Sequence, residues 1–525
     1  MQRLTSISTT RKPAMPWLRA VCTAVLIATQ VLTPVPAAAQ LLGLGGDGEM
    51  TAGAERRLGD QIARELYREP DYLQDPVLDA YVDDIWLRLK AAARTRGDLT
   101  PELDERFAWD VMLSRDRSIN AFALPGGYLG VHLGLIAAVG SADELATVLG
   151  HELSHVTQRH IARMMDKQNR QMPLMLAGMI LGMIAASKSN SGDAGQAVLM
   201  GSQAAFMQNQ LSFSRDMERE ADRVGFGVLT QAGFAPEGAA AMFERLQYAS
   251  RLNDNGSFPY LRSHPLNSER ISDMQGRFQF EGGRTPGGNA LRLTMTHAMI
   301  ASRARVLSRP GVDVLRLWVN AAGSGEFAAS APAQQAGTLY AAAFAASTLR
   351  DMAAARALAE RLNARTAGDP AAARLARLLD AEIALAAGAA PRAAALLNAS
   401  AKDRPEMLLA AQAAIATRQA APMIPPLRDW VALNPRDALV WRTLANLYGA
   451  QGDTLRAVRA DAEANIAIFD YPAARDRLRA AQELVRKGVT PGGPPIDHYE
   501  ASIIDTRARA VDVMVREQAA EPPLR

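Results

Sequence analysis

Residues 141–163 read SADELATVLGHELSHVTQRHIAR, and the interpretation of the whole chain depends on this stretch. Ser141 followed three positions later by Glu144 is a capping box, in which each side chain accepts a hydrogen bond from the other residue's backbone N–H. Apolar residues then recur at helical spacing through Leu153. The stretch therefore predicts a helix that begins at this capping box.

Two histidines lie one turn apart on that helix, His151 and His155, with Glu152 beside them. The HExxH spacing is typical of zinc hydrolases, because two imidazoles supply half of a tetrahedral site and the carboxylate acts on water without ligating the metal. The chain has seven His in 525 residues, so the motif would arise by chance in roughly one such chain in two hundred. The competing interpretation is two surface histidines on an amphipathic helix.

A second predicted helix could complete such a metal site. It begins at Ser214 and runs through RDMEREADRVGFGVLTQA to Gly233. Glu218 and Asp222 share one face of it, whereas Glu220 points elsewhere. A glutamate from a separate helix would complete a His₂Glu set, and the other acid would hydrogen-bond a ligand histidine. Acidic residues at a helix start are also favoured by the helix dipole alone, so the residues leave the choice of ligand open.

The first 39 residues have the pattern of a secretory signal. Four basic residues precede an apolar run over 20–32, and three alanines at 37–39 offer a cleavage site. An uncleaved anchor is the alternative, although the run is short for a bilayer. Removal of this segment would lower the formal charge of +3 by four, to −1, which indicates no nucleic-acid partner. It would also remove Cys22, the one cysteine, and so exclude a thiol nucleophile.

Upstream of the HExxH helix, residues 121–124 and 128–131 predict two strands joined by a tight Pro-Gly-Gly turn. A short apolar and aromatic run over 107–112 precedes them. Two interpretations of the hairpin stay open. It is a small supporting sheet, or it presents an edge strand that pairs with an extended peptide substrate.

Residues 173–186, PLMLAGMILGMIAA, form the most apolar stretch after the signal, and Met-rich sequence follows up to residue 213. At this length the stretch is too short to span a membrane. One interpretation is a buried helix. The other is a lid over the site, spanning residues 172–213, that touches a membrane or a partner.

Four segments together resemble a known family: HELSH, SRDMEREAD, NAFALPGGYLGVHLGL and SHPLNSERI. They are similar to the zinc metallopeptidases of the HtpX and CAAX-protease type, over about residues 50–275. The layout of the whole chain resembles the BepA-like family of periplasmic protease-chaperones. The resemblance implies a mainly α fold with a small β-sheet, a zincin-type (gluzincin) metalloprotease domain, and one Zn2+ ion per subunit.

The resemblance also assigns roles to individual residues. It implies that His151, His155 and Glu218 ligate the zinc, that Asp222 supports a ligand, and that Glu152 is the catalytic general base. It also implies that the hairpin binds substrate, through Asn120, Ala121, Phe122 and Ala123. His160 and His132 match no ligand position and are expected on a helix surface and in a strand.

The resemblance further implies that His264 approaches the metal and holds the site in a resting state. On residues alone, His264 with Pro265 predicts only a turn, and Arg270 only a surface charge. Two roles for His264 stay open. It is a fourth ligand that acts as a latch, or it hydrogen-bonds the tetrahedral intermediate and contributes to catalysis.

Beyond a Gly-rich linker at 281–290, the sequence turns to Ala, Leu and Arg at helical spacing, with Pro recurring at intervals in the thirties. This pattern indicates helix-pair repeats, and a non-repetitive helical bundle is the alternative. One unit matches the tetratricopeptide pattern through Trp441, Leu444, Ala445, Tyr448 and Ala457, although Asp461 stands where an aromatic is usual. Such repeats form an α-solenoid whose concave surface binds segments of other proteins. A last helix from His498 to about Gln518 would pack into that surface or cap it.

The predicted organisation is a signal peptide at 1–39, a zinc metalloprotease domain at 50–280, a linker at 281–290, a repeat domain at 291–490 and a C-terminal helix and tail at 491–525. We expect a periplasmic zinc endopeptidase that acts in quality control of outer-membrane proteins. Its implied partners are unfolded or stalled outer-membrane proteins and, through the repeats, the outer-membrane assembly machinery. Peripheral contact with a membrane is compatible with this organisation. The alternative is a non-proteolytic chaperone with a latent metal site.

Overall fold

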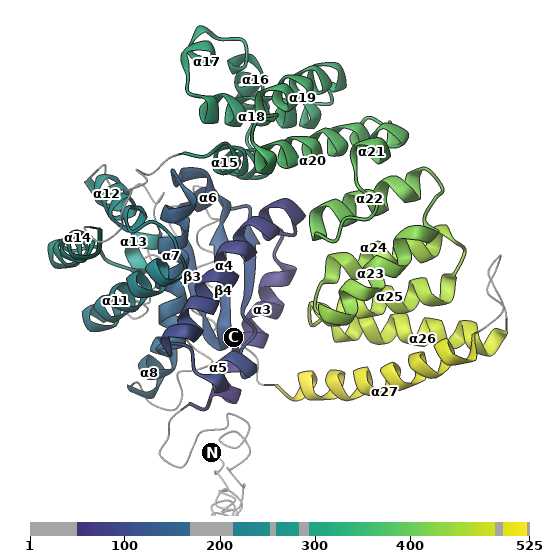
Figure 1. Cartoon of the computed structure of the whole chain (residues 1–525). Helices are drawn as coiled ribbons and strands as arrows, with labels where there is room; N and C mark the ends of the chain where they lie inside the picture. Colours follow the sequence, from purple (N-terminus) through teal and green to yellow (C-terminus); the bar gives the residue numbers. More distant parts are fainter. Residues whose placement is uncertain (1–49, 168–213, 252–258, 283–292, 489–496, 522–525) are drawn as a thin grey trace, which may run out of the picture.

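The computed structural model describes residues 50–167, 214–251, 259–282, 293–488 and 497–521. The predicted signal segment, the Met-rich segment 172–213 and residues 283–290 of the predicted linker lie outside these ranges. The N-terminal half is helical around one small sheet (Figure 1). Its helices are α3 Ala52–Arg68, α4 Pro76–Arg96, α5 Pro101–Arg106, α6 Leu133–Ala138, α7 Ala142–Thr157, α8 His160–Lys167, α11 Arg215–Gln231, α12 Glu237–Arg251, α13 Tyr260–Ser263 and α14 Ser268–Gly282.

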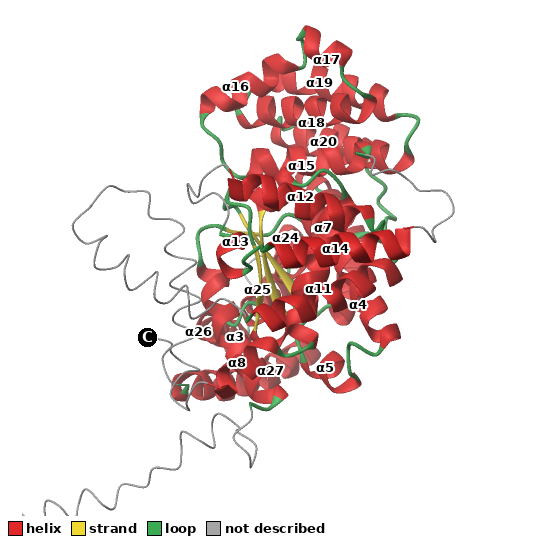
Figure 2. Ribbon diagram, turned by 90° about the vertical axis from the view of Figure 1, so that its left-hand side faces the viewer, coloured by secondary structure: helices red, strands yellow, loops and turns green. Residues whose placement is uncertain are grey.

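Within the described residues the sheet has four strands in the order β1-β2-β4-β3, and helices surround it (Figure 2). The strands are β1 Tyr72–Leu73, β2 Asp110–Ser114, β3 Ala121–Leu124 and β4 Tyr128–His132. β2 and β4 are parallel, whereas β1 with β2 and β3 with β4 are antiparallel. The predicted hairpin is confirmed, and β3 lies at an edge of the sheet.

The turn between β3 and β4 is a short 3-10 segment, η1 Pro125–Gly127. Gly126 and Gly127 both have a positive φ, of 71° and 83°. A Cβ at Gly126 would lie 2.7 Å from the Cα of Arg56 on α3. Glycine is therefore required both for the left-handed backbone and for the close packing of α3 on the turn.

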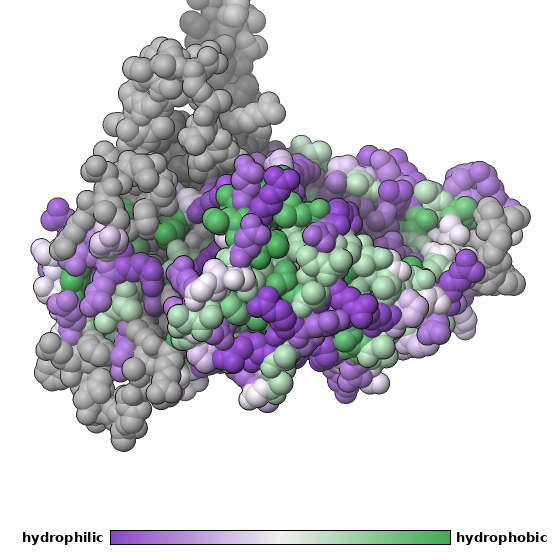
Figure 3. Space-filling model, turned by 90° about the horizontal axis from the view of Figure 1, so that it is seen from above, coloured by the Kyte–Doolittle hydropathy of each residue, from purple (hydrophilic) through white to green (hydrophobic). Residues whose placement is uncertain are grey.

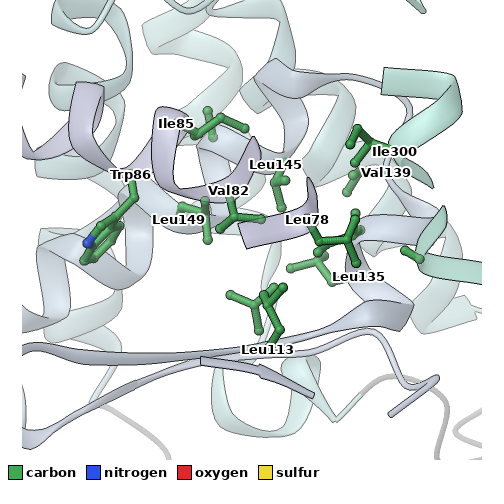
Figure 4. Close-up of a cluster of buried hydrophobic side chains, with 14 of the residues drawn as sticks. Leu78, Val82, Ile85, Trp86, Leu113, Leu135, Val139, Leu145, Leu149 and Ile300 are labelled. Atoms are coloured by element: carbon green, nitrogen blue, oxygen red, sulfur yellow. The ribbon is translucent and has the colours of Figure 1, made fainter. Parts of the chain in front are cut away.

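The main apolar core lies between the sheet and the helices that cover it (Figure 4). Leu78 and Val82 of α4 and Leu145 and Leu149 of α7 are almost fully buried in it. They recur at i, i+4 because that spacing turns one face of each helix toward the core. The same core continues through Ile300, which lies beyond the predicted linker, so the two halves of the chain share buried apolar surface.

Two glycines allow α7 and α11 to cross closely. A Cβ added to Gly225 of α11 would lie 3.1 Å from the carbonyl oxygen of Gly150 and 3.1 Å from the backbone nitrogen of His151 on α7. Backbone atoms of a packed helix have little room to retreat. The absence of a side chain at Gly225 therefore lets α11 lie directly beside the HExxH motif.

The C-terminal half consists of further helices, many of which pack against their neighbours in sequence. They form an arc beside the N-terminal half (Figure 1). The bounds are α15 Met295–Leu307, α16 Val312–Ala321, α17 Gly325–Ala329, α18 Pro332–Thr348, α19 Met352–Thr366, α20 Pro370–Ala386, α21 Ala390–Leu396, α22 Arg404–Ala416, η2 Ala421–Met423, α23 Ile424–Leu433, α24 Ala438–Ala450, α25 Thr454–Ala467, α26 Tyr471–Lys487 and α27 His498–Ala520.

The unit that matches the tetratricopeptide pattern corresponds to the helix pair α24–α25. Leu444 and Tyr448 of α24 are buried, and Ala457 of α25 packs against the same cluster. The assignment of this helix pair and of the others as repeats stays a prediction. Figure 3 views the molecule from the end that carries α16 to α19, where hydrophobic and hydrophilic residues both face outward. Val312, Val314 and Leu317 of α16 are among the exposed apolar side chains.

Ion pairs attach the arc to the N-terminal half. Arg303 of α15 is buried and donates to both carboxylate oxygens of Asp75, the residue that caps α4, at 2.7 Å each. It also donates to both oxygens of Glu382 on α20 at 3.0 Å. Near the end of the arc, Glu521 accepts from Arg64 of α3 at 2.8 Å. The chain thus returns to its first described helix.

No helix within the described ranges is both long enough and apolar enough to cross a membrane.

Candidate active site

Helix α7 begins where the capping box predicted. The Ser141 Oγ accepts a hydrogen bond from the backbone N–H of Glu144 at 3.1 Å. The Glu144 carboxylate, however, accepts from the backbone N–H of Gly140 at 3.0 Å, and it pairs with Arg245 of α12 at 2.8 Å. The serine half of the box is therefore confirmed, and the glutamate attaches α12 to the helix start instead.

Four side chains from three parts of the chain meet at one point: His151 and His155 of α7, Glu218 of α11, and His264, which directly follows α13. One ligating atom of each lies within 4.8 Å of the others. All four side chains are buried, with at most 5% of any residue exposed. The alternative of two surface histidines is therefore wrong.

The distances within this cluster fit a metal ion. Ligands at 2.0–2.1 Å from a tetrahedral zinc are separated by about 3.3 Å. The Nε2 atoms of His151 and His155 are 3.0 Å apart, and the Nε2 of His151 is 3.3 Å from the Nδ1 of His264. The Oε1 of Glu218 lies 3.0 Å from that Nδ1 and 3.5 Å from the Nε2 of His155. Nitrogen and carboxylate donors at these separations are a suitable set for a metal ion.

Glu152 lies beside the cluster rather than within it. It is fully buried, and its Oε2 accepts a hydrogen bond from the backbone N–H of Ala123 in β3 at 2.9 Å. Its Oε1 lies 3.4 Å from the Nε2 of His264 but has no hydrogen-bond partner among the described residues. A buried carboxylate oxygen without a hydrogen bond is costly. The position of the Glu152 carboxylate suits a group that exchanges a proton with a molecule bound at the cluster.

Asp222 supports His151, and Arg270 supports Asp222. The Asp222 Oδ1 lies 3.0 Å from the His151 Nδ1, and the Arg270 guanidinium donates to both Asp222 oxygens at 2.7 and 2.9 Å. Arg270 also lies 2.8 Å from the Oε2 of Glu218 and donates to the carbonyl of Pro265. The expectation of a surface charge at Arg270 is wrong, because this residue is only 5% exposed.

His160 is also buried, so its expected place on a helix surface is wrong. Its Nδ1 lies 2.9 Å from the Nδ1 of His155, and its Nε2 lies 3.0 Å from the Oε2 of Glu220. A continuous helix would turn these two histidines apart, but α7 ends at Thr157 and Arg159 has a φ of 51°. Sequence periodicity could not predict this break. His132 ends strand β4, as expected.

Burial and neighbouring charges have opposing effects on the pKa values of the histidines and glutamates of the site. Burial opposes charge on His151, but Asp222 and Glu218 outweigh it and raise the His151 pKa to about 10. Burial lowers the pKa of His155 well below its usual value and raises the pKa of Glu152. Although burial opposes ionisation of Glu218, His264 and His151 hold its pKa well below its usual value. An ionised carboxylate among buried imidazoles favours a cation.

The residues predicted to bind substrate lie in and just before strand β3, beside this site. β3 pairs with β4 along one edge, and along its other edge the N–H of Ala123 faces Glu152. The Oδ1 of Asn120 is buried and has no hydrogen-bond partner within the described residues. The segment that carries His264 also approaches this strand, because the Tyr260 N–H donates to the carbonyl of Ile119 at 3.4 Å.

Residues 81–278 match the family model described as Peptidase family M48. The chain is 37% identical over 243 residues to a "Putative beta-barrel assembly-enhancing protease" from Vibrio cholerae. The aligned region covers 45% of this chain and 46% of the relative. The chain is 32% identical over 240 residues to the "Beta-barrel assembly-enhancing protease" of Escherichia coli, with the same coverage. A "Mitochondrial metalloendopeptidase OMA1" from Arabidopsis thaliana is 29% identical over 194 residues, covering 37% of this chain and 36% of the relative.

The chain thus spans about half the length of the bacterial relatives it matches. The matched family segment contains the HExxH helix, Glu218, His264 and Arg270. The family is described as a peptidase family, the two bacterial relatives are named proteases, and the Arabidopsis thaliana relative is named a metalloendopeptidase. The buried donor set is consistent with a metal-dependent peptidase, because its side chains are spaced as ligands of one ion. Residues 81–278 are therefore similar to the peptidases of family M48, and the buried donor set within this segment suits a metal ion.

Proposed function

We propose that the chain is a zinc-dependent endopeptidase of the periplasm that acts on β-barrel outer-membrane proteins during their assembly. The observation that carries the proposal is the cluster of His151, His155, Glu218 and His264 with Glu152 beside it. The pattern of a secretory signal at residues 1–39 supports export. The names of the bacterial relatives support the substrate class.

In this proposal His151, His155 and Glu218 hold the zinc. A zinc ion in such a site supplies Lewis-acid activation of water and of the scissile carbonyl. Glu152 takes the proton of the attacking water and delivers it to the leaving amine. Its raised pKa, caused mainly by burial, suits a group that must both accept and release a proton. The N–H of Ala123 holds the carboxylate in place.

Strand β3 would hold the substrate. Its outer edge lies beside Glu152, so a peptide that pairs with Ala121, Phe122 and Ala123 would pass the site in an extended conformation. The Oδ1 of Asn120 would accept a hydrogen bond from that peptide, since it has no partner within the described residues. The segment from Tyr260 to His264 would have to move to admit the peptide.

We propose that His264 is a latch and that the structure represents the resting state. Its Nδ1 is close to Glu218 and His151, and its Nε2 is close to Glu152, so one imidazole fills the place where substrate and water would react. The latch would open when the predicted repeats engage a client protein. The repeats would also contact the outer-membrane assembly machinery.

The test is metal analysis of the purified full chain together with a cleavage assay on an unfolded outer-membrane protein. We expect about one zinc per chain and measurable cleavage. Glu152→Gln should retain zinc, because this residue is not a ligand, and should lose cleavage by about two to four orders of magnitude. Cell fractionation should find the protein in the periplasm, and the inactive variant should co-purify with its clients.

A wild-type chain without zinc, or a fully active Glu152→Gln, would contradict the enzyme proposal. Zinc binding together with client binding but no cleavage would instead favour a chaperone with a latent metal site.

A further inference from the structure

The two imidazoles of the HExxH motif have different outer partners. His151 turns its Nδ1 toward the Asp222 carboxylate at 3.0 Å. His155 instead turns its Nδ1 toward another imidazole, that of His160, at 2.9 Å. His160 in turn faces Glu220. Metal-binding histidines usually donate their second N–H to a carboxylate, a carbonyl or water, so an imidazole in this place calls for an explanation.

The direction of these hydrogen bonds follows from the metal site. The Nε2 of His155 faces the cluster, so this nitrogen must be unprotonated to bind a metal ion. The proton of the neutral ring is then on Nδ1, which donates to the Nδ1 of His160. His160 consequently carries its own proton on Nε2 and donates it to Glu220 at 3.0 Å. Each donor in this series therefore has an acceptor.

Helix α11 organises the whole arrangement. Its Glu218 belongs to the cluster, its Asp222 contacts His151, and its Glu220 reaches His155 through His160. Arg163 of α8 donates to the same Glu220 oxygen at 2.8 Å and holds the carboxylate in place. Helix α11 therefore contributes a member of the cluster, the outer partner of His151 and the carboxylate that holds His160, the outer partner of His155.

We propose that His160, held by Glu220, is a positioning residue that fixes the tautomer and orientation of His155 for metal binding. The inference rests on the proposed function, since it assumes that the cluster binds zinc. Space filling does not explain the contacts. His160 is fully buried, and a buried ring with two polar nitrogens is costly unless both are hydrogen-bonded. An apolar side chain would fill the same volume without that requirement.

The test compares the zinc dissociation constants of full-length variants, measured by competition with a chromogenic chelator. His160→Ala removes the acceptor for the Nδ1–H of His155, and we expect it to weaken zinc binding by about 10- to 100-fold. His160→Asn places an amide oxygen near the position of the imidazole Nδ1, so it should restore most of the affinity. Glu220→Gln should weaken binding by a smaller factor, and adding it to His160→Ala should have little further effect, because Glu220 acts through His160.

A matched control is His297→Ala. His297 is also buried and also makes two hydrogen bonds, at 2.7 Å with Tyr81 and at 3.0 Å with the carbonyl of Val139, but it lies on α15 outside the cluster. Its loss should lower stability and leave the zinc affinity within about twofold of wild type. Cobalt-substituted His160→Ala should also show a shifted visible spectrum, which a purely structural change elsewhere would not produce.

The outcomes separate the two proposals. If the wild-type chain takes up no zinc, the proposed function and this inference both fail. If the wild type binds zinc and His160→Ala binds it equally well, only this inference fails, whatever happens to the stability of the variant. If His160→Ala does not fold, Glu220→Gln decides the question, because it removes the carboxylate partner of His160 while His160 stays in place, and zinc binding as tight as in the wild type would overturn the inference.

Discussion

The Nε2 of His264 lies 3.4 Å from the Oε1 of Glu152, and the Nδ1 of the same ring lies 3.0 Å from the Oε1 of Glu218. One imidazole therefore stands between the proposed general base and the proposed glutamate ligand. Tyr260 stacks on this ring, with 4.7 Å between the ring centroids. The segment that carries both residues also contacts the chain just before strand β3, because the Tyr260 N–H donates to the carbonyl of Ile119.

We expect His264→Ala to raise basal proteolysis. A latch that favours the closed state by about 1.4 kcal/mol leaves about one molecule in ten open, so its removal would raise activity about tenfold. The measurements are the initial rate of cleavage of an unfolded substrate and the rate of self-cleavage. If His264 instead stabilises the tetrahedral intermediate, both rates should fall by orders of magnitude.

Removal of the metal should destabilise the peptidase domain. A ligand present at about a thousand times its dissociation constant stabilises the folded state by about 4 kcal/mol. For a domain of this size, each kcal/mol shifts the unfolding temperature by about 2–4 °C. Dialysis against a chelator should therefore lower the first unfolding transition by about 8–16 °C in calorimetry, and added zinc should restore it. An unchanged transition would show that these side chains do not hold a tightly bound ion.

The crossing of α7 and α11 should not tolerate a side chain at Gly225. We expect Gly225→Val to destabilise the protein by about 1–3 kcal/mol and to weaken zinc binding, because it pushes Glu218 and Asp222 away from α7. Gly227→Val is a matched control on the same helix. Its Cβ would meet only the end of the Arg96 side chain, at 2.5 Å, which can move aside. Denaturant unfolding measures the stability and chelator competition measures the zinc affinity. Equal losses of both in the two variants would show that the close crossing at Gly225 has no special importance.

The buried contact of Arg303 should couple the arc to the peptidase domain. Arg303→Ala leaves the carboxylates of Asp75 and Glu382 without their shared cation, and we expect a loss of about 3–5 kcal/mol in the free energy of unfolding. Arg316→Ala is the control. Arg316 is exposed and pairs only at 3.6 Å with Asp313, so its removal should change stability by less than about 0.5 kcal/mol. A similar loss of unfolding free energy in both variants would mean that the buried contact of Arg303 stabilises the protein no more than an exposed ion pair does.

Local patterns in the amino-acid sequence were enough to predict several features of the fold and the site. The spacing of HExxH placed His151 and His155 on one face, because a helix has 3.6 residues per turn, and Ser141 and Ser214 marked the starts of α7 and α11. The alternation around the Pro-Gly-Gly turn predicted the hairpin of β3 and β4. These features depend on residues close in the chain, whose mutual geometry the backbone restricts.

The side chains that complete the site from distant parts of the chain could be identified only from the packing of the helices. The burial of Arg270 and its bonds to Asp222 depend on the packing of α14 against α11, which no local pattern encodes. The contact of His160 with His155 depends on the backbone break at Arg159. The continuity of the core from Leu145 to Ile300 likewise follows from α15 packing on α6. Burial and pairing of charges are properties of the assembled fold, because each depends on groups that are far apart in sequence.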